Sequence, residues 1–410
     1  MKRTSAAYAG YFLIVIAVAV IGIAVWKGVR NKVPIIYSSH DMLTSIWGKY
    51  KARYLEPNTF RTVDSQRNNV TTSEGEGYTM LRSVWLDDKP TFDQSWKWTQ
   101  DNLQHSGDHL FSWLFGERED GTYGILTSQN GQNSASDADT DIALALTFAY
   151  ARWQDPAYLT GAKSIISDIW SQEVIIIQGK PYLAADNVEK KYTDSIVVNP
   201  SYFAPYAYRI FAQIDPAHDW KGLIDTSYDV LEKSMTSQLG TVSTSANIPP
   251  NWISLGRQDA SIHAPGPTRP NLDTNFGFDA MRVPWRVGLD WDWYQEPRAL
   301  KILTSMGFLD TEWQARQIIH DIYAHDGKVV DLTEAPSMYG ASLPALVAVN
   351  GADADAAYRT KLVALYNPDT QDWNQVLSYY DDNWAWFGMA LYNNELPNLW
   401  ASLSKQTPTH

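Results

Sequence analysis

Apolar residues recur along most of this chain at the three- and four-residue spacing of one helix face, and polar, glycine- and proline-containing loops separate these stretches. Two short β-like runs, 125–126 and 174–177, do not alternate with the helical patterns. We therefore expect a mostly α protein with too many helices for a simple bundle. The predicted helices cover residues 41–54, 73–87, 91–105, 137–153, 156–171, 201–213, 219–237, 279–294, 298–307, 311–324, 340–350, 353–366 and 383–394.

The predicted helices differ in how their polar residues are distributed. Residues 137–153 (DADTDIALALTFAYARW) are apolar nearly all round, which is typical of a helix buried on all sides. The helices at 91–105 and 219–237 keep one charged face. Alternation of buried and amphipathic helices predicts two concentric rings, an α/α toroid. Residues 239–277 form a long irregular insertion, and such loops often shape binding sites, although packing over a helix end explains this one equally well.

The start of the chain has a different pattern. Residues 4–26 are 23 consecutive uncharged residues between Arg3 and Lys27, which is long enough to span a bilayer as a helix. Positive residues then follow without an A-x-A cleavage site, so we expect an uncleaved anchor rather than a signal peptide. Positive charge is nearly balanced across the span, and the topology therefore stays open.

No long linker divides the chain after about residue 40, which predicts one large domain. We divide the chain into a membrane anchor (1–30), a linker (31–40) and a single domain (41–405).

Composition narrows the classes of function. The 33 Lys and Arg residues against 46 Asp and Glu give a formal net charge of −13, which disfavours nucleic-acid binding. The 18 Trp and 23 Tyr residues suit stacking against sugar rings, although many must fill a large core. The absence of cysteine excludes disulfides, thiolate nucleophiles and Cys-ligated zinc. HExxH, P-loop and GxGxxG motifs are absent, and the calcium-like DADTD run has Ile142 where the loop needs glycine, so we predict no metal or cofactor.

Carboxylates lie at the entrances of three predicted helices. In TTSEGEGY (71–78), Glu74 and Glu76 belong to two overlapping capping boxes, and composition does not choose between them. In SASDADTDIALAL (134–146), three aspartates open an apolar helix after Ser136, a candidate N-cap. In GFDAMRVPWR (277–286), Asp279 either pairs with Arg282 on the helix surface or faces a polar pocket.

The motifs SEGEGY (73–78), ASDADTDIALAL (135–146) and GFDAMRVPWR (277–286) resemble, in order and spacing, the signatures of glycoside hydrolase family 8. NPSYFAPY (199–206) is similar to another segment of that family, and FSWLFG (111–116) and YYDDNWAWFG (379–388) to its weaker signatures. The resemblance covers roughly residues 40–400. It implies an (α/α)6 barrel, with six inner and six outer helices, that hydrolyses β-1,4-linked polysaccharide with inversion at the anomeric carbon.

The resemblance also implies roles for individual residues. Glu74 is expected to be the general acid and Asp279 the general base, with Arg282 beside it. Asp137 is expected to hydrogen-bond the sugar in the central subsite, and Tyr202 to face the cleavage subsite. Capping of the helix then falls to Glu76. An aspartate base is typical of the branch that contains many endoglucanases and xylanases, and makes chitosanase activity less expected.

Inversion requires one protonated and one ionised carboxyl, about 6.5–9.5 Å apart. We expect Asp137 and partial burial to raise the pKa of Glu74, and a helix N-terminus to keep Asp279 ionised. Trp113, Trp252, Trp285 and Tyr380 are candidates for sugar stacking because they lie near motifs or in the long loop, but each is about as well explained as core.

The function that follows is a membrane-anchored endo-β-1,4-glucanase acting on cellulose or a related β-glucan. Xylan, mixed-linkage glucan or a non-catalytic glycan-binding toroid remain alternatives. We expect an extracytoplasmic catalytic domain at the cell membrane, with a polysaccharide synthase or export complex as a candidate partner, and a secreted protein if the apolar segment is cleaved.

Overall fold

The computed structural model describes residues 38–406. The predicted anchor (1–30) and most of the predicted linker (31–40) lie outside the described residues. The linker prediction is wrong at its end, because Ser39 and His40 already belong to the first described helix. Within the described part, every helix is too short or too polar to cross a membrane.

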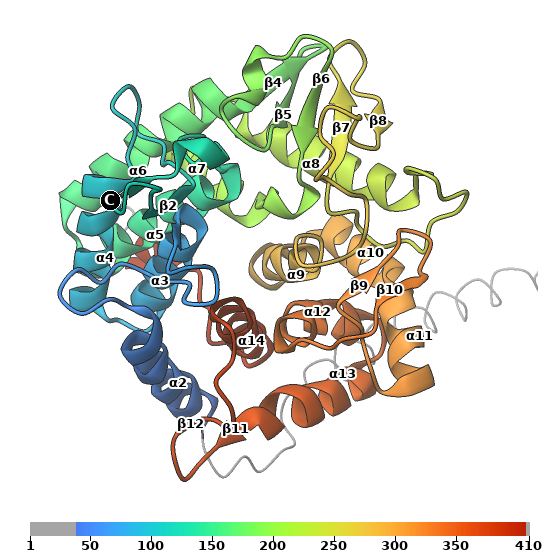
Figure 1. Ribbon diagram of the computed structural model, residues 1–410. Helices are drawn as coiled ribbons and strands as arrows, with labels where there is room; N and C mark the ends of the chain where they lie inside the picture. The colour runs from blue at the N-terminus through green and yellow to red at the C-terminus, as the bar shows by residue number, and fades with distance from the viewer. Residues whose placement is uncertain (1–37, 407–410) are drawn as a thin grey trace, which may run out of the picture.

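Helices dominate the structure, as predicted, and fall into two sets that differ in burial. One set is buried along most of its length and lies towards the middle of the molecule, where α9, α12 and α14 are seen end-on (Figure 1). Its members are α3 (Ser73–Trp85), α5 (Ser136–Trp153), α7 (Pro205–Ile214), α9 (Arg282–Tyr294), α12 (Pro336–Val349) and α14 (Tyr379–Tyr392).

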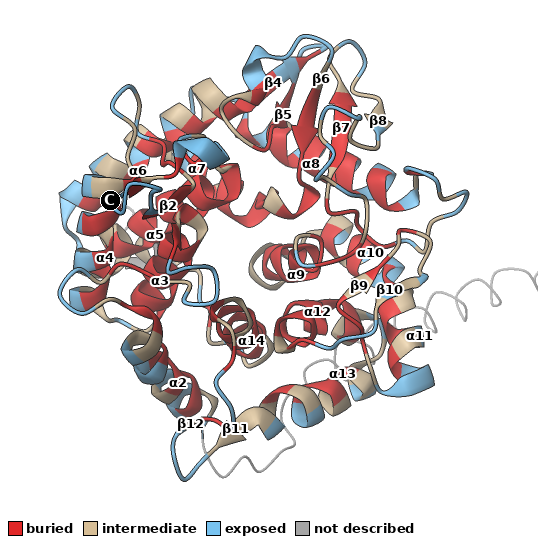
Figure 2. Cartoon of the chain, in the orientation of Figure 1, coloured by how far each residue is buried: buried red, intermediate tan, exposed pale blue. Residues whose placement is uncertain are grey.

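The second set surrounds the first and exposes one face, which appears as mixed colours along each helix in Figure 2. Its members are α2 (Ser39–Tyr54), α4 (Lys89–Asn102), α6 (Pro156–Asp168), α8 (Trp220–Thr236), α10 (Pro297–Ser305) and α13 (Gly351–Ala357). α11 (Gly307–Arg316) and α15 (Leu399–Gln406) are additional. The alternation of inner and outer helices fits an (α/α)6 toroid.

Two glycines allow inner helices α12 and α14 to approach closely. A Cβ atom on Gly340 would lie 2.2 Å from the Trp384 carbonyl oxygen, and one on Gly388 would lie 2.2 Å from the Gly340 carbonyl oxygen. Neither neighbour is a flexible side-chain end, so only glycine fits at these two positions.

Short antiparallel strands connect the helices. The pairings are β1 (Thr71–Thr72) with β2 (Leu114–Glu117) and β2 with β3 (Tyr123–Ile125); β4 (Val174–Ile177) with β5 (Lys180–Leu183); β6 (Ser195–Val198) with β7 (Ile253–Gly256) and β7 with β8 (Ile262–His263); β9 (Ile322–Tyr323) with β10 (Val329–Asp331); and β11 (Tyr366–Asn367) with β12 (Asp372–Trp373). The segment 239–277 is therefore not wholly irregular, because it contains β7 and β8.

Two predicted helix boundaries are also wrong in ways that matter for the site. The helix predicted at 279–294 begins at Arg282, so Asp279 lies in the turn before it. The helix predicted at 311–324 ends at Arg316, after which Gln317 adopts a left-handed φ of 56° and the chain enters β9.

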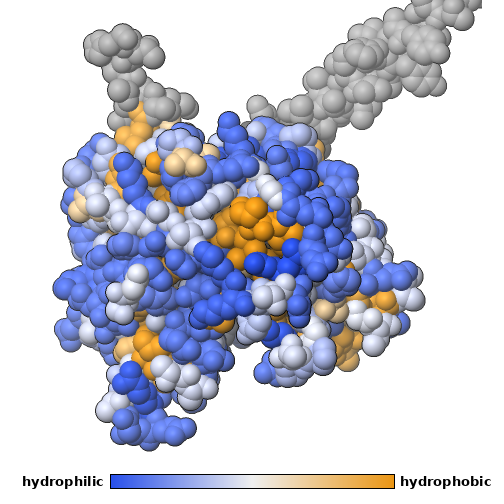
Figure 3. Space-filling model, turned by 90° about the horizontal axis from the view of Figure 1, so that it is seen from above, coloured by the Kyte–Doolittle hydropathy of each residue, from blue (hydrophilic) through white to orange (hydrophobic). Residues whose placement is uncertain are grey.

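Outer helices with charged faces and a formal net charge of −13 predict a largely polar surface. The face drawn in Figure 3 is mostly hydrophilic, with a compact hydrophobic area near its middle and smaller ones towards its edges.

Candidate active site

Glu74 stands at the entrance of α3. Strand β1 pairs with β2 through Thr72 and Leu114, and Thr72 then caps the helix by accepting a hydrogen bond from the Gly75 N–H at 3.1 Å. Every residue of α3 is buried except Glu74, whose side chain is 22% exposed. An otherwise buried helix therefore presents one carboxyl group to solvent at its mouth.

Both predicted capping boxes are wrong, because Thr72 is the cap and neither glutamate serves the helix start. The Glu76 carboxylate is fully buried and accepts hydrogen bonds from the Thr62 backbone N–H at 2.7 Å and the Ser95 hydroxyl at 2.6 Å. Glu76 therefore connects α3 to the loop after α2 and to α4, on the side away from the cleft.

Gly75 allows an aromatic ring to approach the carboxyl-bearing turn. A Cβ atom at this position would lie 2.6 Å from the Tyr379 hydroxyl oxygen. α14 therefore reaches the mouth of α3 because residue 75 has no side chain.

Asp137 lies in the first turn of α5. Its Oδ1 accepts a hydrogen bond from the Ala138 N–H at 2.9 Å, and its side chain is 2% exposed. The sequence predicts Ser136 as the N-cap of this helix, and this prediction is wrong. Ser136 is already helical, and its hydroxyl donates to the Ala184 carbonyl at 2.7 Å.

Asp279 lies in the turn that precedes α9, with its side chain 32% exposed. The sheet formed by β6 and β7 pairs Val198 with Ile253, which leaves Asn199 and Trp252 as neighbours just beyond the paired residues. The Trp252 indole N–H donates to Asp279 Oδ2 at 3.0 Å. The segment predicted as an irregular insertion thus holds one of the three candidate carboxyls.

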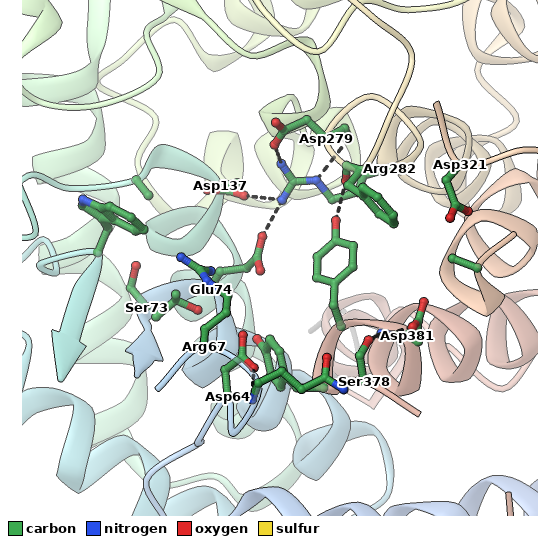
Figure 4. Close-up of a pocket in the computed structure, with 18 of the residues that line it drawn as sticks. Asp64, Arg67, Ser73, Glu74, Asp137, Asp279, Arg282, Asp321, Ser378 and Asp381 are labelled. Atoms are coloured by element: carbon green, nitrogen blue, oxygen red, sulfur yellow. Dashed lines mark hydrogen bonds and ion pairs between the residues drawn. The ribbon is translucent and has the colours of Figure 1, made fainter. Parts of the chain in front are cut away.

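Arg282 joins all three carboxyls, as Figure 4 shows. Its Nη1 donates to Glu74 Oε2 at 2.6 Å and to Asp137 Oδ2 at 2.8 Å, and its Nη2 donates to Asp279 Oδ1 at 2.8 Å. The guanidinium also lies over the Tyr202 ring, 5.2 Å from its centroid. Of the two alternatives at the level of sequence, the structure favours the polar pocket: Asp279 and Arg282 do pair, but inside the cleft and not on the helix surface, because the Arg282 side chain is only 2% exposed.

The site shifts the acidity of its carboxyls. Burial raises the pKa of Glu74 to about 7; the Arg282 guanidinium opposes this rise, and the charges of Asp137 and Asp279 add to it. Burial also raises the pKa of Asp279, but Arg282, the Asn199 amide and the Trp252 indole lower it. The expected rise for Glu74 is present, with burial as its main cause and Asp137 as a smaller one.

The carboxyls face a cleft of about 620 Å³. Tyr202, Trp113 and Tyr380, three of the predicted substrate-binding residues, line it. Trp252 touches the site through Asp279 and packs edge-on against Tyr202 with ring centroids 5.7 Å apart.

The structure does not bring Trp285 to the cleft. Trp285 is 2% exposed, donates to the Phe387 carbonyl at 2.9 Å and packs against the Trp384 ring. It is a core residue because its position on α9 faces α14 rather than the cleft.

Several cleft residues were missed at the level of sequence. Phe278 lines the cleft, is 41% exposed and lies edge-on to the Tyr380 ring at 6.1 Å between centroids. Its position directly before Asp279 was an available clue. Tyr379 and Arg67 also line the cleft. Among residues 38–406, no group of three His, Cys, Asp or Glu side chains is arranged to hold a metal ion.

Comparison with known proteins identifies the family to which this chain belongs. The sequence model of glycosyl hydrolases family 8 matches residues 21–332. The chain belongs to glycosyl hydrolases family 8. The three carboxyl-bearing motifs all lie within the matched range.

One curated relative is Endoglucanase 2 of Ruminiclostridium josui, which is 30% identical over 270 residues, covering 64% of this chain and 53% of that protein. The chain thus spans about half the length of this curated relative.

Two solved structures share the fold. The endo-1,4-D-glucanase from Vibrio fischeri ES114 superimposes with a TM-score of 0.69 at 24% identity, covering 85% of this chain and 94% of that one. A cold-adapted family 8 xylanase gives a TM-score of 0.70 at 17% identity, covering 90% and 93%. At these identities the similarity concerns the fold of family 8 and leaves the substrate open.

Proposed function

We propose that this family 8 protein is an endo-acting, inverting glycoside hydrolase that cleaves β-1,4-linked polysaccharide, with cellulose or a related β-glucan as substrate. The observation that carries the proposal is the set of three carboxyls held by Arg282 at the cleft, one of which, Glu74, has its pKa raised to about 7. The names of its relatives, several of which are endoglucanases, support the β-1,4-glucan specificity.

In this proposal Glu74 is the general acid. With a pKa of about 7, a large fraction of Glu74 keeps its proton near neutral pH and can donate it to the leaving glycosidic oxygen. Asp279 is the general base and takes a proton from the attacking water. Arg282 and the Trp252 indole favour its ionised form because both donate hydrogen bonds to its carboxylate.

Asp137 binds substrate rather than transferring a proton. Its carboxylate is buried and bound by Arg282, so it stays a hydrogen-bond acceptor for a sugar hydroxyl. Tyr202, Trp113, Tyr380 and Phe278 supply aromatic surface along the cleft for the flat faces of the sugar rings.

A reducing-sugar assay with two matched glutamine variants tests the acid. Glu74→Gln should lose at least about a hundredfold in kcat on carboxymethylcellulose and lichenan, the contribution typical of general acid catalysis. Glu76→Gln is the control, because Glu76 lies two residues away on α3, is buried, also has its pKa raised to about 7, and does not face the cleft. Equal activity of wild type and Glu74→Gln would contradict the assignment.

The same assay separates the candidate substrates. Xylan is the alternative favoured by the cold-adapted xylanase that shares this fold, and chitosan tests the branch with a different base. Binding to several glycans without turnover of any of them would instead support a glycan-binding toroid.

Product stereochemistry tests the inverting mechanism. Fresh hydrolysis products followed by NMR should appear first as the α-anomer. Initial appearance of the β-anomer would refute inversion, since a retaining enzyme needs a nucleophile in place of the base.

We further propose that residues 1–30 anchor the protein in the cell membrane with the catalytic domain on the extracytoplasmic side, where it would trim polysaccharide beside a synthase or export complex. The support is the uncharged run 4–26. The full-length chain should stay with membranes after washing in high salt and leave them only after proteolysis or extraction with detergent. Recovery of a shortened, freely released chain would favour cleavage and secretion.

A further inference from the structure

A second buried ion pair lies beneath the three carboxyls of the site. Asp141 on α5 binds Arg286 on α9 through two hydrogen bonds, from Nη1 to Oδ1 at 2.9 Å and from Nη2 to Oδ2 at 2.8 Å. The Tyr206 hydroxyl on α7 accepts a third hydrogen bond from Arg286 at 2.8 Å. The side chains of Asp141 and Arg286 are 4% and 1% exposed, so this group is closed to solvent.

This pair repeats the geometry of the pair above it. Asp137 and Asp141 are four residues apart on α5, and Arg282 and Arg286 are four residues apart on α9. Each pair therefore lies about one helical turn, roughly 5.4 Å along the axis, from its equivalent. The two pairs form parallel connections between α5 and α9, and the upper one opens into the cleft.

The lower pair also meets the helix that bears the proposed acid. A Cβ atom on Gly77 of α3 would lie 3.4 Å from the Asp141 Cβ, so α3 packs directly on this part of α5. With Tyr206 from α7, four inner helices converge here, and three of them carry or adjoin the carboxyls of the site.

We propose that Asp141, Arg286 and Tyr206 are positioning residues that hold Arg282 in register with Glu74, Asp137 and Asp279. This inference rests on the hydrolase function proposed above. Arg282 Nη1 is shared by Glu74 and Asp137, so a small shift of α9 against α5 changes how one guanidinium divides its hydrogen bonds. The guanidinium of Arg286 donates one hydrogen bond to each oxygen of the Asp141 carboxylate. Such a two-point contact resists a shift because its two hydrogen bonds constrain both distance and orientation.

The pair also contributes charge close to the site. The negative charge of Asp141 disfavours ionisation of the carboxyls above it, and the positive charge of Arg286 favours it. In the native protein the two charges largely offset each other, so removal of Asp141 alone leaves a net positive charge beneath Glu74. The titratable and charged groups that face Glu74 are Arg282, Asp137, Asp279, Tyr78, Tyr202, Tyr379 and Tyr380, and those that face the lower pair are Asp137, Arg282, Tyr206 and Tyr208.

Helix α9 provides a matched control. One turn beyond Arg286, Asp290 is fully buried and accepts hydrogen bonds from Arg209 at 2.8 and 3.1 Å and from the Tyr228 hydroxyl at 2.6 Å. This cluster contains the same three residue types, but only Asp290 lies on α9, whereas Arg209 lies on α7 and Tyr228 on α8. Loss of either aspartate should reduce stability, and only loss of Asp141 should affect the chemistry.

The test compares Asp141→Asn with Asp290→Asn through kcat, KM and the pH profile of kcat/KM on lichenan. Asp141→Asn should lower kcat about tenfold with little change in KM. It should also move the high-pH limb of the kcat/KM profile, which reports the ionisation of Glu74, to lower pH by between several tenths of a pH unit and about one unit. Asp290→Asn should leave both the position of this limb and the value of kcat unchanged. The same loss and the same limb in both variants would overturn the proposal.

If Asp141→Asn does not fold, Tyr206→Phe and Tyr228→Phe replace the aspartate variants, since each removes one hydroxyl from its cluster. Tyr206→Phe should lower kcat severalfold at unchanged KM, and Tyr228→Phe should leave kcat unchanged; equal kcat values would overturn the proposal.

A measurement without substrate separates this inference from the proposed function. The pH dependence of the stability difference between a protein and its Glu74→Gln variant reports the ionisation of Glu74. Repeated in the Asp141→Asn background, or in the Tyr206→Phe background if that variant is used, it reports the effect of the lower pair even if no glycan is hydrolysed. For Asp141→Asn, a midpoint displaced to lower pH supports the proposal, and an unchanged midpoint refutes it. For Tyr206→Phe, which leaves both charges in place, a displaced midpoint supports a shift of Arg282 and an unchanged one refutes it.

Discussion

The proposed acid should make the protein less stable at high pH, and Glu74→Gln should remove this effect. Glu74 has its pKa raised from 4.5 to about 7, a difference of about 2.5 units. At 1.36 kcal/mol per unit, the ionised side chain costs the folded state up to about 3 kcal/mol. The side chain is 22% exposed, so this value is an upper bound.

The sign follows from proton linkage. Between pH 4.5 and 7 the folded state holds the Glu74 proton more tightly than the unfolded state, so the free energy of unfolding falls as pH rises through this window. Below the window both states are protonated, and above it both are ionised. Glu74→Gln should therefore match wild type at pH 4 and exceed it by about 2–3 kcal/mol at pH 8.

Urea unfolding of both proteins at a series of pH values between about 4 and 8 measures this difference, and the pH at which the difference stops increasing gives the pKa of Glu74 in the folded protein. Activity supplies a second readout, because kcat/KM should fall about tenfold per unit above pH 7 as the acid loses its proton. A stability difference that does not vary with pH would refute the reasoning, since Glu74 would then titrate equally in both states. Glu76→Gln should show the same pH-dependent stabilisation but keep its activity.

Three further substitutions test individual contacts. Gly75→Ala places a Cβ about 2.6 Å from the Tyr379 hydroxyl, so it should cost about 1–3 kcal/mol by thermal unfolding despite alanine's helix propensity, and should lower kcat. Trp252→Phe removes the hydrogen bond that lowers the pKa of Asp279, so the low-pH limb of kcat/KM should move up; an unmoved limb would contradict a base role for Asp279. Trp285→Phe should cost about 1–3 kcal/mol in urea unfolding and leave KM unchanged, as expected of a core residue.

The sequence predicts the helices of the toroid well because the burial of each helix determines how apolar residues are distributed around it. The run 137–153 is apolar nearly all round, and the structure places it in the inner ring as α5. The short strands leave a weaker record. β7 and β8 are four and two residues long and interrupt a loop rich in polar residues, so their pairing with β6 depends on contacts distant in sequence.

Contacts between elements set the limit for the site as well. The resemblance to family 8 selects Glu74, Asp137 and Asp279, and the structure places all three on Arg282. The resemblance does not distinguish Trp113, which lines the cleft, from Trp285, which packs in the core. Both lie near motifs, and their environments are decided by contacts between elements rather than by local sequence: Trp113 lies just before β2, and Trp285 lies on α9.

Helix geometry explains which acid near each entrance faces the cleft. Successive helical residues turn by about 100°, so residues two apart point to nearly opposite sides and residues four apart to nearly the same side. Glu74 therefore faces the cleft, and Glu76 faces α4. On α5, Asp137 binds Arg282, and Asp139 turns away to hydrogen-bond the Phe111 N–H at 2.9 Å.

Asp141, four residues after Asp137, returns to the same side one turn deeper and binds Arg286. The three aspartates at the entrance of α5 therefore differ in direction and role. Asp137 lies at the cleft, Asp139 is a buried structural residue, and Asp141 is a second partner for α9. This division depends only on residue spacing, and it explains why three aspartates open a helix for which capping requires none of their side chains.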